Sequence, residues 1–102
     1  MSRREKIEKM LKDDPEDAFL NYALAKELQT EGDHVGALDG YDRVIVRHPK
    51  YVAAYFQKGQ LLVERGEMEA ARDVLRRGIE VAQEVGDSHA AGEMTAFEES
   101  LT

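Results

Sequence analysis

Cysteine is missing from this chain of 102 residues, proline occurs only twice, and no long apolar run is present. Without cysteine there is no disulfide framework, no thiolate zinc site and no cysteine nucleophile. This lack fits a reducing compartment, and we expect a cytoplasmic protein. No apolar stretch approaches the roughly 20 residues of a membrane-spanning helix. The first residues are charged, so we expect neither a membrane span nor a signal peptide.

The balance of charge disfavours nucleic acid as a ligand. Fourteen Lys and Arg residues stand against 21 Asp and Glu, which gives a net charge of −7, and a negative surface repels a phosphate backbone. The few serines lie in no nucleophile motif. The segment 32–36, which contains two glycines, lacks a preceding strand and the lysine of a phosphate loop. We therefore expect no enzyme, no cofactor and no nucleic-acid partner.

An internal repeat is the strongest pattern in the sequence. The two prolines, Pro15 and Pro49, lie 34 residues apart, and a shift of the whole sequence by 34 superimposes six further identical pairs. These pairs are Leu28/Leu62, Gly32/Gly66, Ala37/Ala71, Asp39/Asp73, Arg43/Arg77 and Ile45/Ile79. Seven matches in one 34-residue window exceed the two or three or so that composition alone would give, so the chain contains a duplication.

Each repeat has the pattern of two helices. Apolar residues recur at helical spacing, a glycine-containing turn interrupts them, and no segment alternates with period two. Gly32 suits the end of one helix and Asp33 the cap of the next, while Asp14 and Pro15 resemble an N-cap followed by a proline at the first helical position. The sequence predicts a single all-α domain over 1–102, with an N-terminal helix (3–12), repeat one (15–48), repeat two (49–83) and a C-terminal capping helix (88–101).

The repeat resembles the tetratricopeptide repeat, a helix–turn–helix unit of 34 residues. Small residues stand where that family has them, at Ala25 and Gly59, and the large position that follows is leucine in both repeats. Gln83 replaces the closing proline of the second repeat, so we expect the helix from Met68 to Val85 to run about one turn longer than its counterpart. The resemblance implies a right-handed alpha-alpha superhelix of tetratricopeptide-type hairpins, with about two full repeats and flanking helices.

The same resemblance implies a protein-interaction scaffold or adaptor that binds a peptide or partner protein. In this family the first helix of each unit lines the concave groove, and matching those positions gives candidate binding residues that combine aromatic rings, amides and one cation. They are Phe19, Tyr22, Lys26, Phe56, Gln57 and Gln60, with Ala23, Gln29, Ala53, Ala90, Met94 and Phe97 as further positions.

One known binding mode of the family is not expected here. Its co-chaperone members grip acidic chaperone tails with a clamp of five polar and basic residues. The matching positions in this chain are Tyr22, Lys26, Gln57, Asp87 and Ala91. Only one of them is basic and Asp87 is acidic, so tight binding of such tails is not expected.

Other interpretations stay open at this stage. Phe19 and Phe56 could belong to the core between helices. Two chains could pair through exposed apolar ends and form a homodimer. The basic N-terminal helix could lie on an anionic membrane surface, and His89 with Glu93, four residues apart, could hold a metal ion.

Overall fold

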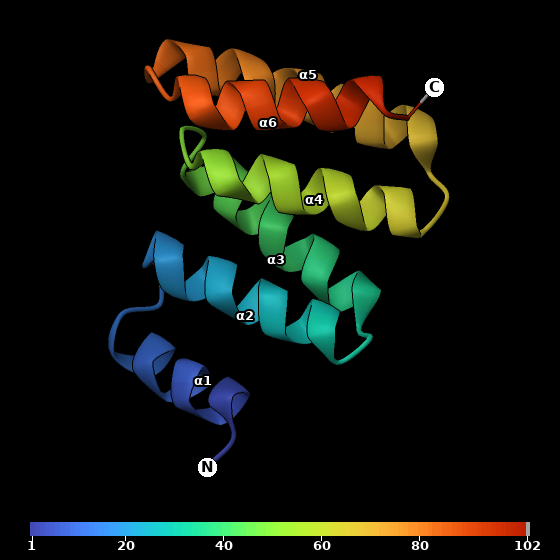
Figure 1. Cartoon of the computed structure of the whole chain (residues 1–102). Coiled ribbons are helices and arrows are strands. Elements are labelled where there is room, and N and C mark those ends of the chain that lie inside the picture. The colour runs from blue at the N-terminus through green and yellow to red at the C-terminus, as the bar shows by residue number, and fades with distance from the viewer. Residues whose placement is uncertain (102) are drawn as a thin grey trace. The chain divides into compact units, whose positions relative to one another are not determined.

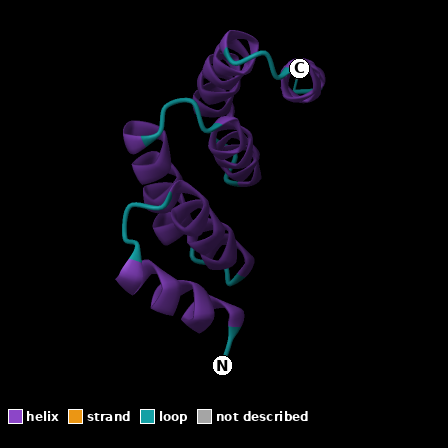
Figure 2. Ribbon diagram, turned by 90° about the vertical axis from the view of Figure 1, so that its left-hand side faces the viewer, coloured by secondary structure: helices purple, strands orange, loops and turns teal. Residues whose placement is uncertain are grey.

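The computed structural model describes residues 1–101, and within that range the chain forms six α-helices and no strand (Figure 2). The helices, in chain order, are α1 (Arg3–Asp13), α2 (Ala18–Thr30), α3 (His34–Arg47), α4 (Val52–Glu64), α5 (Met68–Glu84) and α6 (Ser88–Glu99). The all-α prediction is confirmed. No helix in the described part of the chain is both long enough and apolar enough to cross a bilayer.

The helices form two compact units, which divide between His48 and Pro49. In the first unit, α2 and α3 form a hairpin and α1 packs on α2. In the second unit, α4 and α5 form the hairpin and α6 packs on α5 (Figure 1). Each unit thus holds one of the two predicted repeats plus one flanking helix. That the whole chain forms a single domain stays a prediction.

Glycines end three of the helices as the sequence predicts. Gly32, Gly66 and Gly86 have positive φ angles of 88°, 77° and 78°, a region that costs an L side chain strain but glycine little. After two of them an aspartate caps the next helix: Asp33 accepts from the Gly36 N–H at 2.9 Å and Asp87 from the Ala90 N–H at 3.0 Å. These turns set the hairpins within each unit.

The predicted start of α2 is wrong by one turn. Asp14 is the C-cap of α1, and Pro15 lies in the turn that follows rather than at the first helical position. Asp17 is the N-cap instead, and its carboxylate accepts from the Leu20 N–H at 2.8 Å. Both aspartates lie near the start of α2, but only the Asp17 carboxylate accepts a hydrogen bond from a free N–H of its first turn.

The two prolines occupy equivalent places. Pro15 follows the C-cap of α1 and Pro49 follows His48, the C-cap of α3, and each begins the two-residue turn before the next helix. The second repeat lacks a proline at its end, and α5 has 17 residues where α3 has 14. The expected extension of α5 is therefore confirmed.

Close approach of the paired helices depends on small residues. A Cβ placed on Gly40 of α3 would lie 2.8 Å from the Cβ of Ala25 on α2, and one on Gly59 of α4 would lie 2.6 Å from a methyl group of Leu75 on α5. Real Cβ atoms do not come that close, so the helix axes of both hairpins could not stay at their present separation with larger side chains.

The N-terminal helix uses its apolar face for packing. Ile7 is buried and Leu11 is half-buried, and α1 packs on α2. Ion pairs reinforce the contact, because Arg3 lies 3.0 Å from Glu27 and Arg4 2.9 Å from Glu31. Ile7 and Leu11 of the apolar face are thus taken up by packing, as expected for an end helix packed on the first repeat, while Met10 of the same face is 50% exposed.

Tyr55 predicts a measurable dependence of stability on pH. Its side chain is 3% exposed, its hydroxyl donates to the Pro49 carbonyl at 2.7 Å, and burial raises its pKa. In the unfolded chain a tyrosine loses its proton near pH 10. The fold holds the proton more tightly, so its contribution to stability is fully present below about pH 10 and is lost as the pH rises through the folded pKa.

We therefore expect Tyr55→Phe to flatten the alkaline loss of stability and to cost about 1 kcal/mol at neutral pH, because the hydrogen bond is gone. Urea unfolding of both proteins at pH 7 and at about pH 10.5 measures the difference. Equal slopes against pH for the two proteins would contradict this account.

Candidate functional site

The first unit contains a hollow that three of the predicted binding residues line. It has a volume of about 290 Å³, and its wall comes from the N-terminal residue of α1 and from one face of α2. The lining residues are Arg3, Phe19, Tyr22, Ala23, Lys26, Glu27 and Thr30. Phe19, Tyr22 and Lys26 lie on one face because they are spaced by three and four residues, about one helical turn.

Aromatic and cationic groups are stacked beside this hollow. The Lys26 ammonium lies 5.8 Å from the centroid of the Tyr22 ring, a distance at which a cation is attracted to the ring face. The Tyr22 ring in turn lies 6.0 Å from that of Tyr41, centroid to centroid. Tyr41 is fully buried and donates a hydrogen bond of 2.7 Å to the side-chain oxygen of Gln29. Contact with this buried ring therefore holds the Tyr22 side chain in place.

Phe19 is exposed rather than part of the core. Its side chain is 62% exposed, which rules out the alternative that it packs between helices. A large aromatic ring on the surface beside a lysine gives apolar contact area and a positive charge at one place.

Phe56 lies in a different environment from Phe19. In the 34-residue register Phe56 is the equivalent of Tyr22, whereas Phe19 is the equivalent of Ala53. Phe56 is half-buried on α4, and its ring centroid lies 5.8 Å from that of Phe97 on α6. The alternative that Phe56 belongs to the core between helices is therefore correct in part, because its ring packs on Phe97 and helps to hold α6 on the unit. Gln57 and Gln60 are half-buried on the same helix.

Several secondary candidates have structural roles instead. Met94 is fully buried, so it offers no exposed surface. The Gln29 amide oxygen accepts from Tyr41. Asp87, which matches one position of the co-chaperone clamp, caps α6. Sequence reasoning missed Arg3 and Glu27 as neighbours of the first-unit hollow; the only signal was the basic character of the N-terminal helix.

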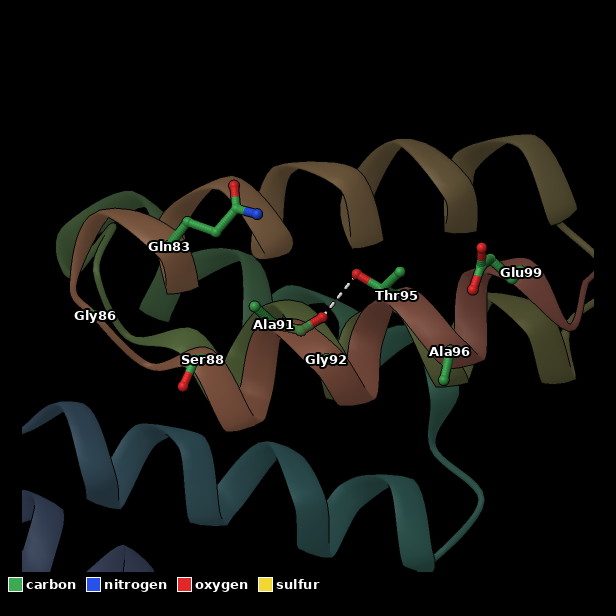
Figure 3. Close-up of a pocket in the computed structure, with 8 residues that line it drawn as sticks. All are labelled: Gln83, Gly86, Ser88, Ala91, Gly92, Thr95, Ala96 and Glu99. Carbon is green, nitrogen blue, oxygen red and sulfur yellow. Dashed lines mark hydrogen bonds between the residues drawn. The ribbon is translucent and has the colours of Figure 1, made fainter.

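A second hollow, of about 540 Å³, lies between α5 and α6 in the second unit. Figure 3 shows its lining: mostly small side chains of α6, with Gln83 projecting from α5. The hydroxyl of Thr95 donates to the Ala91 carbonyl one turn earlier at 2.8 Å, so it is used within α6. No sequence motif indicated this hollow.

The candidate metal site contains only the two residues that the sequence suggested, His89 and Glu93. His89 Nε2 lies 3.2 Å from a carboxylate oxygen of Glu93. Within residues 1–101, no three side chains of the metal-binding types gather at one place, while metal sites in proteins usually take three or four protein ligands. The pair is an ordinary contact one turn apart on an exposed helix face.

Comparison with known proteins identifies the family. The family model described as tetratricopeptide repeat matches residues 28–92. The chain belongs to the tetratricopeptide repeat family. A TPR repeat-containing protein of Pseudomonas aeruginosa is 32% identical over 93 residues, which cover 91% of this chain and 89% of the relative. The predicted class of tetratricopeptide-type hairpins is thereby confirmed.

Solved structures of tetratricopeptide repeat proteins are similar to this chain. A tetratricopeptide repeat domain protein from Salinibacter ruber, solved by NMR, is 32% identical with a TM-score of 0.83, and the match covers 86% of this chain and 89% of that one. The TPR2B domain of yeast Sti1, in its complex with pHsp70, has a TM-score of 0.88 at 22% identity and covers 96% of this chain and 78% of that one. At that identity the second likeness shows the fold alone.

Proposed function

We propose that this tetratricopeptide protein is a non-enzymatic adaptor that binds a peptide segment of a partner protein through the surfaces of α2 and α4. In the first unit that surface is formed by Phe19, Tyr22 and Lys26, and in the second by Phe56, Gln57 and Gln60. The tetratricopeptide fold is a common protein-interaction module, and the Sti1 domain was solved with a bound partner. A cytoplasmic location stays a prediction.

The observation that carries the proposal is the exposure of Phe19 beside a fixed tyrosine and a lysine. Phe19 is 62% exposed, and covering this exposed part of the ring would stabilise a complex by roughly 1–2 kcal/mol. Tyr22 is held in place by Tyr41, so little side-chain entropy is lost when a ligand packs on it. Lys26 adds a donor for a backbone carbonyl or a carboxylate of the ligand.

The test begins with selection of binding peptides from a random phage-displayed library on the wild-type chain. A synthetic copy of an enriched peptide is then titrated by fluorescence anisotropy against wild type and variants. We expect Phe19→Ala to weaken binding about tenfold or more, because truncation of a buried aromatic anchor costs over about 1.4 kcal/mol. Phe56→Ala tests the second unit in the same way.

Val35 offers a matched control, since it is also an exposed apolar residue, 64% exposed, but lies at the start of α3. Val35→Ala should change the dissociation constant by less than about twofold. If no peptide is enriched, or if Phe19→Ala and Val35→Ala have equal effects, the assignment of the binding surface is wrong.

A further inference from the structure

The side of α3 opposite the fully buried Tyr41 is exposed to solvent and carries two valines. Val46 is 79% exposed and Val35 is 64% exposed. Between them along the helix lie Asp39 and Arg43, which are exposed as well. A rotation of about 100° per residue directs all four side chains away from Tyr41. We call these four residues the α3 seam: Val35, Asp39, Arg43 and Val46.

The equivalent positions of α1 and α5 bear charges instead of valines. A shift of 34 residues places Val35 on Glu69 of α5. The same shift places Val46 on Glu80, and the opposite shift places it on Lys12 of α1. Glutamate and lysine favour a helix more than valine does and are the usual residues of an exposed face. A contact that covers the two valines would remove apolar surface from water, which the equivalent helices cannot offer.

The charges in the middle of the seam are available for a contact with another chain. Within residues 1–101 neither Asp39 nor Arg43 has an ion-pair partner, whereas Arg77, the equivalent of Arg43, lies 3.3 Å from Glu80. An acid and a base one turn apart can pair with a second copy of themselves only if that copy runs in the opposite direction. In a parallel pair of α3 helices Asp39 would face Asp39 and Arg43 would face Arg43, and like charges repel.

An antiparallel pair of α3 helices centred on Tyr41 makes the seam complementary to itself. Asp39 of each copy then lies opposite Arg43 of the other, which gives two ion pairs. At each end Val46 lies beside Val35 of the other copy, so the exposed valines cover each other. Helices that pack through their side chains lie about 8–10 Å apart, a separation at which an arginine reaches an aspartate on the facing helix. Between positions 35 and 46 the contact follows about 17 Å of helix.

We propose that two copies of this protein form a dimer through the α3 seam, with the two helices antiparallel. The contact uses the same surface on both copies, so it closes at the dimer. A single helix pair buries less than the standard interface of about 1,600 Å², so we expect a weak dimer with a dissociation constant on the order of 0.1 mM. The inference is independent of the peptide-binding proposal, because residues of α1 and α2 alone line the hollow beside Phe19.

Sedimentation equilibrium at concentrations from about 10 μM to 1 mM tests this proposal. We expect the average mass of the wild type to rise with concentration and to approach that of a dimer. Val46→Glu, which introduces the residue found at the equivalent position of α5, should weaken association about tenfold or more. Val85→Glu is the matched control: it makes the same change at a 43% exposed valine of the second unit and should leave association unchanged within about twofold.

Charge reversal tests the antiparallel register. Asp39→Arg alone and Arg43→Asp alone should each weaken association about tenfold or more, because like charges then lie opposite each other. In an equal mixture of the two variants, arginine again faces aspartate at both positions, so association should return, which two misfolded proteins could not do. A wild type that stays monomeric at 1 mM or so, a mass that rises past the dimer, equal effects of Val46→Glu and Val85→Glu, or a mixture as dissociated as its components would overturn the proposal.

Discussion

Tyr41→Ala is expected to lower the free energy of unfolding by about 3–5 kcal/mol, the cost of removing a large buried aromatic side chain. Tyr41 is fully buried on α3, its ring lies beside that of Tyr22, and its hydroxyl donates to Gln29. Since domains of this size are stable by only about 5–15 kcal/mol, this variant should lie near the limit of folding.

Tyr41→Phe separates the two contributions. It keeps the ring and removes the hydroxyl, so we expect a loss of about 1 kcal/mol. Urea unfolding followed by circular dichroism gives both values. A Tyr41→Ala variant as stable as Tyr41→Phe would show that the ring contributes little, against the contacts described above.

Two glycines should respond in opposite ways to the same substitution. A Cβ on Gly78 of α5 would lie 2.6 Å from the Cβ of Tyr55 and 2.8 Å from the sulfur of Met94, whereas a Cβ on Gly92 of α6 meets nothing within 4 Å. Alanine favours a helix over glycine by about 1 kcal/mol, while overpacking of a core costs typically 1–3 kcal/mol.

We therefore expect Gly92→Ala to stabilise the protein by up to about 1 kcal/mol, and Gly78→Ala to destabilise it by up to about 2 kcal/mol once the helix preference is subtracted. Gly78→Leu should be worse and can prevent α4, α5 and α6 from packing. Thermal and urea unfolding at low protein concentration compare the variants. Stabilisation by Gly78→Ala would mean that the three helices are not as close as the structure has them.

Local signals made the helices predictable from the sequence. Gly32, Gly66 and Gly86 end helices because few other residues tolerate positive φ, and Asp33 caps α3 through its own short side chain. The cap of α2 was misplaced because Asp14 and Asp17 both precede it, and the choice depends on which carboxylate reaches a free N–H. That is a matter of three-dimensional geometry rather than of residue type.

The candidate site was predictable only in part for the same reason. Spacing alone places Phe19, Tyr22 and Lys26 on one face of α2, and the structure has them around one hollow. Helical spacing places both Phe19 and Phe56 on the candidate binding faces of α2 and α4, yet Phe19 is exposed and Phe56 packs on Phe97. This difference arises from contacts between helices distant in sequence, which helical periodicity does not encode. The contribution of Arg3, through its ion pair with Glu27, is likewise a tertiary contact.

Binding through the exposed face of α2 is the central claim, and an NMR titration of the ¹⁵N-labelled chain with a selected peptide tests it most directly. We expect the largest changes in amide chemical shift at residues 19–26, around Phe19, Tyr22 and Lys26, and their loss in the Phe19→Ala variant. Changes confined to the outer surface of α3, around Val35 and Val46, would contradict the claim.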